Sequence, residues 1–261
     1  MDYKKINKES WNKQVPVHFE SDFYNVPAFI AGNTSLNQPE LDILGDVSGK
    51  SILHLQCHFG QDTISLSRMG AITTGVDLSD TAIEQAKKLN EQCGTDAKFV
   101  VSDIYDLPKN LEGQFDIVFT SYGTIGWLPD LDKWAGVVNH FLKGGGTFIF
   151  AEFHPAVWMF DDDHNSVAYN YFTSDPIVES YSGTYAQKDS DVELKHISWN
   201  HGLAEVMTSL MSQGLAIRHF KEHDFSPYNC FNGMQEDGPK EFRITKFGNK
   251  MPLMYTLVAE K

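Results

Sequence analysis

The chain has 261 residues, of which 41% are hydrophobic and 21% are charged, with a net charge of −14 and only three cysteines. This composition is that of an ordinary globular protein and excludes a disordered chain, a coiled coil, a collagen and a disulfide-stapled domain. The acidity argues against nucleic acid as a partner, because no dense basic patch offsets it. No run of 18 apolar residues and no apolar leader is present, so we expect no membrane partner and a reducing, cytoplasmic location.

From residue 50 onward, short apolar runs alternate with helical patterns. Strands are predicted at residues 51–57, 72–77, 97–101, 115–121 and 147–152. Helices are predicted at residues 61–69, 79–93 and 131–142 from apolar side chains that recur on one face. Because no hairpin turns separate the strands, the pattern predicts βαβ units and a parallel sheet.

The sequence changes character after the fifth strand. Residues 154–198 are rich in Asp, Ser and Tyr with short alternating runs, which predicts an insertion with a small antiparallel element. We then expect a helix that begins near Leu203 and stops at Gly214. Strands at residues 215–220 and 253–259 and a loop over residues 226–250 complete the prediction.

Ligands bind an open parallel sheet at the carboxyl ends of its strands, so the residues that follow each strand are the candidates for a site. The first turn lacks both the G-x-G-x-x-G dinucleotide fingerprint and the P-loop motif. It offers one glycine, Gly60, before a helix, while Asp77 ends the second strand and Asp103 follows the third. This pattern predicts a nucleoside without phosphates, with Asp77 accepting both ribose hydroxyls and Asp103 accepting the adenine amino group.

Five short segments follow one another along the chain in an order and at a spacing that are typical of one family. They are ILHLQCHFG at 52–60, GVDLS at 75–79, SD at 102–103, FDIVF at 115–119 and LKGGG at 142–146. In this order the segments resemble the Rossmann-like (class I) S-adenosylmethionine-dependent methyltransferases. The resemblance implies an α/β three-layer sandwich whose seven-stranded sheet is mostly parallel with the last strand antiparallel, and it implies S-adenosylmethionine as the methyl donor.

Under this resemblance residues 1–261 form a single methyltransferase domain. Its expected parts are an N-terminal helical lid (1–47), a donor-binding half (48–153), a substrate-side insertion (154–198) and a C-terminal helix with strands (199–261). The donor-binding residues that it implies are Gln56, His58, Gly60, Asp77, Leu78, Asp103, Ile104 and Ser121. The first loop of the family usually reads acid-x-Gly-x-Gly-x-Gly, but here those positions hold His54, Gln56, His58 and Gly60. We therefore expect Gln56 or a backbone group to replace the usual acid.

Methyl transfer from a sulfonium proceeds by in-line displacement and needs a base only when the acceptor carries a proton. The candidate catalytic residues are His154 and Tyr122, with His201 as a further candidate base. Tyr24, Trp127, His154 and Trp158 are the candidate substrate-binding residues, and core packing is the alternative for the aromatic ones. No metal site is expected, since the acidic segment 161–164 is typical of a solvated loop.

The class of acceptor follows by exclusion. Residues 121–124 lack the Asp/Asn-Pro-Pro-aromatic motif of the enzymes of this fold that methylate nucleobase amines or glutamine, and no cysteine follows a proline as in cytosine-C5 enzymes. The fourth strand ends without the acid of metal-dependent catechol-type enzymes. A small-molecule acceptor remains the expectation. The alternatives are a macromolecule (RNA or protein) methyltransferase, a nicotinamide-dependent oxidoreductase and a non-catalytic nucleoside-binding protein.

Overall fold

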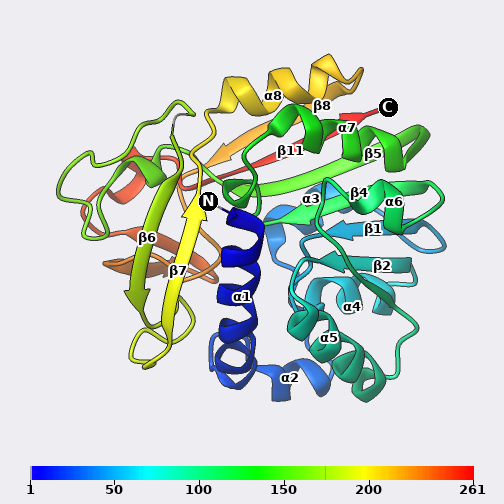
Figure 1. Cartoon of the computed structure of the whole chain (residues 1–261), viewed down its shortest axis with the longest axis horizontal. Helices are drawn as coiled ribbons and strands as arrows, with labels where there is room; N and C mark the ends of the chain where they lie inside the picture. The colour runs from blue at the N-terminus through cyan, green and yellow to red at the C-terminus, as the bar shows by residue number, and fades with distance from the viewer. Residues whose placement is uncertain (1, 174) are drawn as a thin grey trace.

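The computed structural model describes residues 2–173 and 175–261, and its centre is a seven-stranded sheet (Figure 1). The strands follow the order β3-β2-β1-β4-β5-β11-β8. They are β1 (Ser51–Leu55), β2 (Ile72–Asp77), β3 (Lys98–Val101), β4 (Phe115–Ser121), β5 (Leu142–Phe153), β8 (Ala216–His223) and β11 (Met254–Glu260). The first five strands pair in parallel, and β11 runs antiparallel between β5 and β8. The predicted mostly parallel sheet with an antiparallel last strand is thus confirmed.

Alternate residues of the central strands point to opposite faces of the sheet, which makes both faces apolar. Leu53 and Val118 pack with residues of α7 (Leu131–Phe141) and α8 (Leu203–Ser212) on one face. Their neighbours Ile52 and Ile117 pack on the other face with residues of α3 (Gln38–Leu44) and α4 (Gln61–Arg68). Two further helices, α5 (Asp80–Cys93) and α6 (Leu107–Asn110), connect the strands. The result is the predicted three-layer sandwich.

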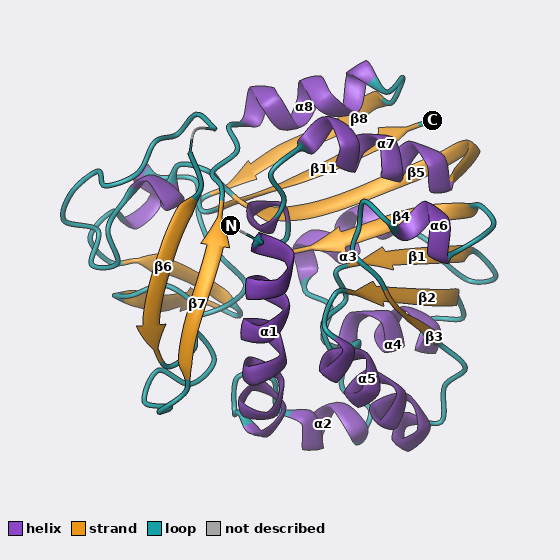
Figure 2. Cartoon of the chain, viewed as in Figure 1, coloured by secondary structure: helices purple, strands orange, loops and turns teal. Residues whose placement is uncertain are grey.

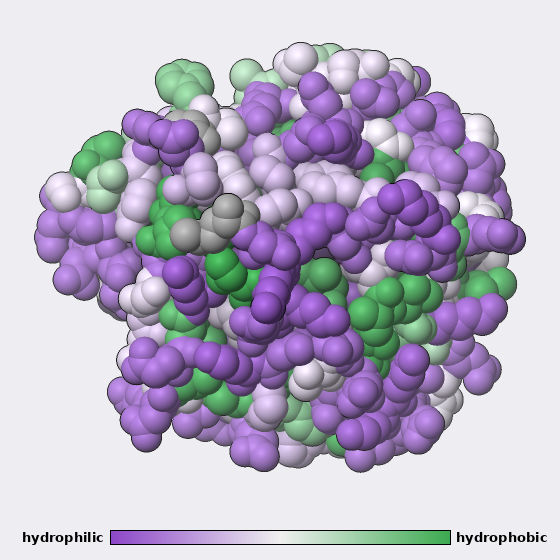
Figure 3. Space-filling model, in the orientation of Figure 1, coloured by the Kyte–Doolittle hydropathy of each residue, from purple (hydrophilic) through white to green (hydrophobic). Residues whose placement is uncertain are grey.

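The described N-terminal segment, residues 2–47, is helical and adds no strand to the seven-stranded sheet. Its helices are α1 (Tyr3–Glu20), α2 (Val26–Ile30) and α3. In Figures 1 and 2, α1 runs between the sheet and a two-stranded antiparallel sheet, β6 (Ile177–Ser182) and β7 (Glu193–Ser198). The Asn7 side chain fixes α1 to β7, because its Nδ2 donates to the carbonyl of Ile197 at 2.8 Å and its Oδ1 accepts from the Ile197 amide at 2.9 Å. The face over α1 and α5 is largely hydrophilic (Figure 3).

The β6–β7 pair confirms the antiparallel element expected in residues 154–198. The loop predicted for residues 226–250 is wrong in part: β9 (Met234–Gly238) and β10 (Glu241–Ile244) form a hairpin there. Its side chains are mostly polar and half exposed, so the sequence offers no apolar alternation to signal it. Strand β5 begins before the predicted residue 147, so the glycines at 144–146 lie within it.

Short 3-10 turns complete the described chain at Ile125–Trp127, Val157–Met159 and Gly248–Lys250. Within residues 2–173 and 175–261, no helix combines the length and apolarity that crossing a membrane requires.

Candidate functional site

A cavity of about 1000 Å³ opens at the carboxyl ends of the parallel strands. Its walls come from the loops after the five parallel strands β1 to β5, from α1 and the segment after it, from β6–β7 and from the segment before β9. This volume lies at the upper end of the range for small-molecule sites. The cavity therefore has room for more than one small ligand where the strand order reverses.

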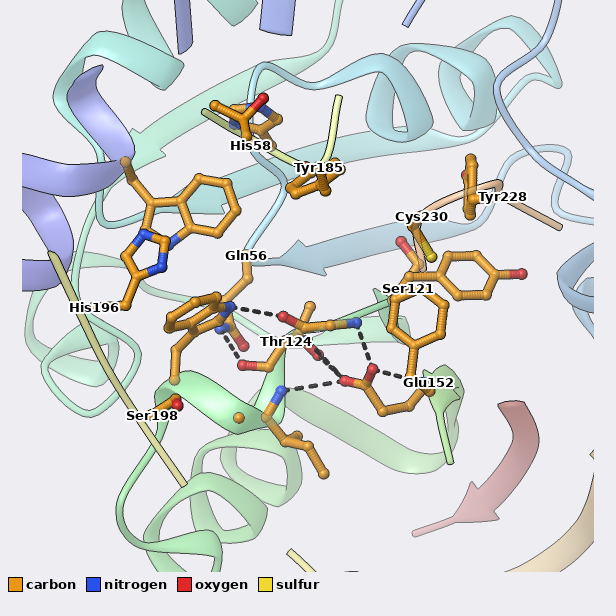
Figure 4. A pocket seen from close by; sticks show the side chains of 18 of the residues that line it. Gln56, His58, Ser121, Thr124, Glu152, Tyr185, His196, Ser198, Tyr228 and Cys230 are labelled. Carbon is orange, nitrogen blue, oxygen red and sulfur yellow. Dashed lines mark hydrogen bonds between the residues drawn. The ribbon is translucent and has the colours of Figure 1, made fainter. Parts of the chain in front are cut away.

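The first loop keeps the backbone shape of a glycine-rich loop although two of its glycines are absent. Gln56 and His58 have φ angles of 56° and 50°, and Gly60 has 81°. The left-handed conformation costs a residue with a Cβ about 1–2 kcal/mol. The Nε2 of Gln56 donates to the Thr124 carbonyl at 2.8 Å, whereas its Oε1 is buried without a partner in the described chain (Figure 4). The loop is thus held in a strained form that faces the cavity.

Asp77 ties this loop to the start of α5. Its Oδ2 accepts from the backbone amide of His58 at 2.8 Å, and its Oδ1 accepts from that of Ser79 at 2.9 Å. Burial raises the pKa of Asp77 to about 6, against the lowering effect of these hydrogen bonds. Asp77 and Leu78 both line the cavity, so a carboxylate ends β2 at the position where the sequence predicted ribose binding.

Asp103 and Ile104 line the cavity after β3. The Oδ1 of Asp103 accepts from Lys4 Nζ of α1 at 2.7 Å and from the Tyr105 amide at 3.0 Å. The N-terminal helix thus contacts the carboxylate that the sequence assigned to the adenine amino group.

Gly60 lines the cavity as well, but packing also requires a glycine there. A Cβ at Gly60 would lie 2.6 Å from the ring of Phe99 and 3.1 Å from Ala86. The loop therefore packs directly on β3 and α5, in addition to any approach of a ligand.

The end of β4 carries Ser121 and Tyr122, which both line the cavity. Ser121 Oγ donates to Asp62 Oδ2 at 2.9 Å, and the Tyr122 hydroxyl donates to the carboxylate of Glu40. Burial, followed by the charge of Asp62, raises the pKa of Glu40 to about 7. Tyr122, with φ of 48°, is therefore paired with a carboxyl group that titrates near neutral pH.

The side chain of Glu152, near the end of β5, accepts hydrogen bonds from backbone amides of the loop after β4. Its carboxylate accepts from the amides of Thr124 at 2.7 Å and Ile125 at 3.2 Å, and also from that of Gly123 (Figure 4). Burial raises its pKa while these donors oppose the shift. This carboxylate fixes the loop after β4.

The structure brings the aromatic candidates Tyr24, Trp127 and Trp158 to the cavity wall. Trp127 Nε1 donates to the Gly123 carbonyl at 2.7 Å, and its ring centroid lies 5.5 Å from that of Trp11 in α1. The Tyr24 hydroxyl bonds that of Tyr185 at 2.5 Å. Trp158 is 41% exposed, which places it at the rim.

His154 does not belong to this site. It is absent from the cavity lining within the described chain, and its Nε2 lies 2.9 Å from Glu222 Oε1 on β8. Its Nδ1 accepts from the amide of Ala156 at 3.1 Å. Both ring nitrogens are therefore engaged away from the cavity, so the geometry gives no support to the catalytic and substrate-binding roles expected for His154. The other candidate base, His201, reaches the lining but bonds the Leu128 carbonyl at 2.7 Å.

Several residues at or beside the cavity were not found from the sequence. They are Trp11, Glu40, Asp62, Tyr185 and Tyr228. Four of them lie in segments that carry no strand-end signal, so only tertiary packing brings them to the site. Asp62 had such a signal, because it stands two residues after Gly60 in the first turn.

Residues 52–146 match the family of methyltransferase domains. An uncharacterized methyltransferase from Synechocystis is 31% identical over 153 residues, which cover 58% of this chain and 70% of that protein. A ubiquinone biosynthesis O-methyltransferase from Coxiella burnetii is 31% identical over 105 residues, which cover 40% of this chain and 44% of that enzyme.

Solved structures show the same fold at low identity. An S-adenosylmethionine-dependent methyltransferase from Clostridium acetobutylicum has a TM-score of 0.58 and 17% identity over 97% of this chain and 98% of its own. Magnesium protoporphyrin IX methyltransferase from Synechocystis has a TM-score of 0.54 and 15% identity over 100% of both chains.

The cavity residues fit S-adenosylmethionine. The carboxylates of Asp77 and Asp103 lie after β2 and β3, and the Oε1 of Gln56 and Nε2 of His54 are buried polar atoms without a partner in the described chain. An acidic lining also suits a donor that carries a positive sulfonium. Fold, site and relatives agree that the chain is an enzyme of the class I S-adenosylmethionine-dependent methyltransferase family.

Proposed function

We propose that this enzyme transfers the methyl group of S-adenosylmethionine to a small-molecule acceptor by in-line displacement. The observation that carries this proposal is the cavity itself, which aromatic side chains line and which α1 and β6–β7 flank (Figure 2). A cavity of about 1000 Å³ suits a donor and a small acceptor together. The donor supplies an activated methyl group when it is bound.

The residues of the chain would exclude water and position the acceptor. Trp11, Trp127 and His196 close one side, with ring centroids 5.0–6.4 Å apart. On another side Tyr122 and Tyr228 meet edge to face at 5.2 Å. Holding the acceptor in line against these rings provides most of what this reaction needs.

A protonated acceptor must also lose a proton. The Tyr122 hydroxyl would receive it and pass its own proton to Glu40, to which it is already hydrogen-bonded. Because the pKa of Glu40 is raised to about 7, its carboxylate is available as an acceptor near neutral pH. Tyr122 and Glu40 therefore replace His154 as the proposed route for the proton.

Two further observations support a small acceptor over a macromolecule. The net charge of −14 opposes binding to RNA. The relative from Coxiella burnetii is, by its name, an O-methyltransferase of ubiquinone biosynthesis.

The experiment follows the label from methyl-tritiated S-adenosylmethionine. The enzyme is incubated with a bacterial extract that has been split by ultrafiltration into small molecules and macromolecules, and Asp77→Asn serves as the impaired control. We expect enzyme-dependent label in the small-molecule fraction only. Label that enters protein or RNA, and is lost with Asp77→Asn, would contradict the proposal.

A further inference from the structure

The methyl donor carries an ammonium group on its amino-acid portion in addition to its sulfonium, and a buried ammonium requires an anionic or strong hydrogen-bonding partner. The first loop offers no anion at the position where the family usually has one, because that position is His54. Burial lowers the pKa of His54 to about 4, and its Nδ1 lies 2.8 Å from Thr63 Oγ1. A neutral imidazole cannot balance the charge of an ammonium.

Asp62 supplies an anion close to this position. It is the second residue of α4, directly after the first loop, and it lines the cavity. Its charge reaches the ring of His54, where it partly offsets the lowering of the pKa that burial causes. Asp62 is therefore an acidic neighbour of the residue that stands in the place of the acid.

Asp62 has no cation of its own. Among residues 2–173 and 175–261, no lysine, arginine or histidine forms an ion pair with it, and its recorded partner is the hydroxyl of Ser121 at 2.9 Å. The two lysines of the described lining bind elsewhere: Lys188 Nζ donates to Asn232 Oδ1 at 2.6 Å, and Lys240 Nζ donates to Asn37 Oδ1 at 2.9 Å. The carboxylate therefore lines the cavity without a cationic partner among the described residues.

Two buried polar atoms near Asp62 also lack partners. His54 is 2% exposed, and its Nε2 makes no hydrogen bond in the described chain. The Oε1 of Gln56 is also buried without a hydrogen-bond partner there. Both residues line the cavity beside the first loop. Unpaired polar atoms inside a protein normally mark the place of a polar ligand or of water.

From this geometry we infer that Asp62 binds the ammonium group of the methyl donor, in place of the acid that His54 replaces, with the Ser121 hydroxyl orienting the carboxylate. The inference concerns the donor and does not depend on which acceptor the enzyme uses. It assigns Asp62 a binding role and leaves Asp77 with the ribose.

A binding cycle between protein and ligand tests this inference by isothermal titration calorimetry. Wild type and Asp62→Asn are titrated with S-adenosylhomocysteine, with its analogue in which hydrogen replaces the α-ammonium, and with 5′-methylthioadenosine, which lacks the amino acid. We expect Asp62→Asn to weaken S-adenosylhomocysteine about 10- to 100-fold, as for a hydrogen bond between charged groups. The affinities for the other two ligands should change less than about twofold, because they lack the ammonium.

Two controls make the outcome decisive. Asp22→Asn removes an exposed carboxylate of the same cavity and should leave all three affinities within about twofold, which excludes a general charge effect. If Asp62→Asn is unfolded, the two ligands are still compared on the wild-type protein. The inference requires the deaminated analogue to bind about 10-fold or more weakly than S-adenosylhomocysteine, and equal affinities would overturn it.

Equal loss for all three ligands in a folded Asp62→Asn, or no loss for any, would overturn the inference. Failure of wild type to bind both S-adenosylhomocysteine and 5′-methylthioadenosine would instead overturn the donor site itself. A normal binding cycle combined with label in macromolecules would refute only the proposed acceptor class.

Discussion

Replacing Asp77 by asparagine should separate donor binding from stability. In the folded protein, burial raises the pKa of Asp77 to about 6 from its ordinary value of 3.8. A raised pKa means that the bound proton stabilises the folded state below pH 3.8, and that this contribution is lost as the pH rises through 6. The difference corresponds to about 3 kcal/mol of unfolding free energy at pH 8. The variant lacks this cost, since an amide does not ionise.

The same substitution should impair the site. An amide keeps one oxygen acceptor where the carboxylate serves both the His58 and Ser79 amides, at 2.8 and 2.9 Å. It also removes the charged acceptor proposed for the ribose hydroxyls, so S-adenosylhomocysteine should bind about 10- to 100-fold more weakly at pH 8.

Urea unfolding at pH 5 and pH 8, with calorimetry at pH 8, measures both effects. Relative to Asp77→Asn, wild type should lose about 1.4 kcal/mol of unfolding free energy between these pH values, because part of the total is already lost below pH 5. Asp96→Asn, at an exposed position away from the cavity, should change neither quantity. A stability difference that does not vary with pH would refute the burial argument, and an unchanged affinity would refute the site assignment.

Three further predictions concern Glu40, His154 and Lys4. The pKa of Glu40 is raised from 4.5 to about 7, so its proton stabilises the fold fully below pH 4.5 and this contribution is lost as the pH rises through 7. Between pH 5 and pH 8, Glu40→Gln should gain about 2.5 kcal/mol of unfolding free energy relative to wild type in urea unfolding, and a stability difference that does not change with pH would contradict this. His154→Ala should lower the unfolding free energy by about 1–3 kcal/mol, because the contact with Glu222 is lost, and should leave the affinity for S-adenosylhomocysteine within about twofold. A stable variant that no longer binds this ligand would show that His154 belongs to the binding site. Lys4→Met breaks the contact with Asp103 at 2.7 Å, so α1 amides should exchange hydrogen faster with less than about 1 kcal/mol of global loss, and unchanged exchange would show that this contact does not hold the helix.

The fold could be predicted because its strands are coded locally. The buried runs of β1, β4 and β5 are apolar on both faces, and glycine or a capping residue marks the helix ends, as at Ser79, whose hydroxyl accepts from the Ala82 amide at 2.9 Å. The same logic placed Asp77 and Asp103 at strand ends, where the structure has them at the cavity. Local patterns therefore suffice where a strand alone positions a side chain.

The expectation that the residues after each strand face the cavity does not hold for His154, where the chain turns. His154 follows β5, but its amide bonds the Leu253 carbonyl at 2.9 Å and its ring faces β8 instead of the cavity. Glu40 and Tyr228 show the converse. They come from segments that the sequence does not place directly after a strand. The Asn37 side chain joins them by donating to the Tyr228 hydroxyl at 2.8 Å and to Glu40 Oε1 at 3.3 Å. Such long-range packing leaves no periodic trace in the sequence.

The first loop shows a limit of motif reading. The absence of glycine at positions 56 and 58 suggested an altered loop, yet Gln56 and His58 both keep the left-handed backbone that glycine adopts readily. Side-chain contacts hold this conformation, including the Gln56 bond to the Thr124 carbonyl at 2.8 Å and the 3.0 Å contact between His58 Nε2 and His18 Nδ1. The shape of the loop survives the loss of its usual residues.

A crystal structure of the enzyme with S-adenosylhomocysteine tests the central claim most directly. The account predicts the ribose hydroxyls at hydrogen-bond distance from the Asp77 carboxylate, the ammonium on Asp62, and free space beside Tyr122 and Tyr228 for a small acceptor. A ligand bound elsewhere would contradict the account. So would one that fills the space beside Tyr122 and Tyr228 and makes no contact with Asp77.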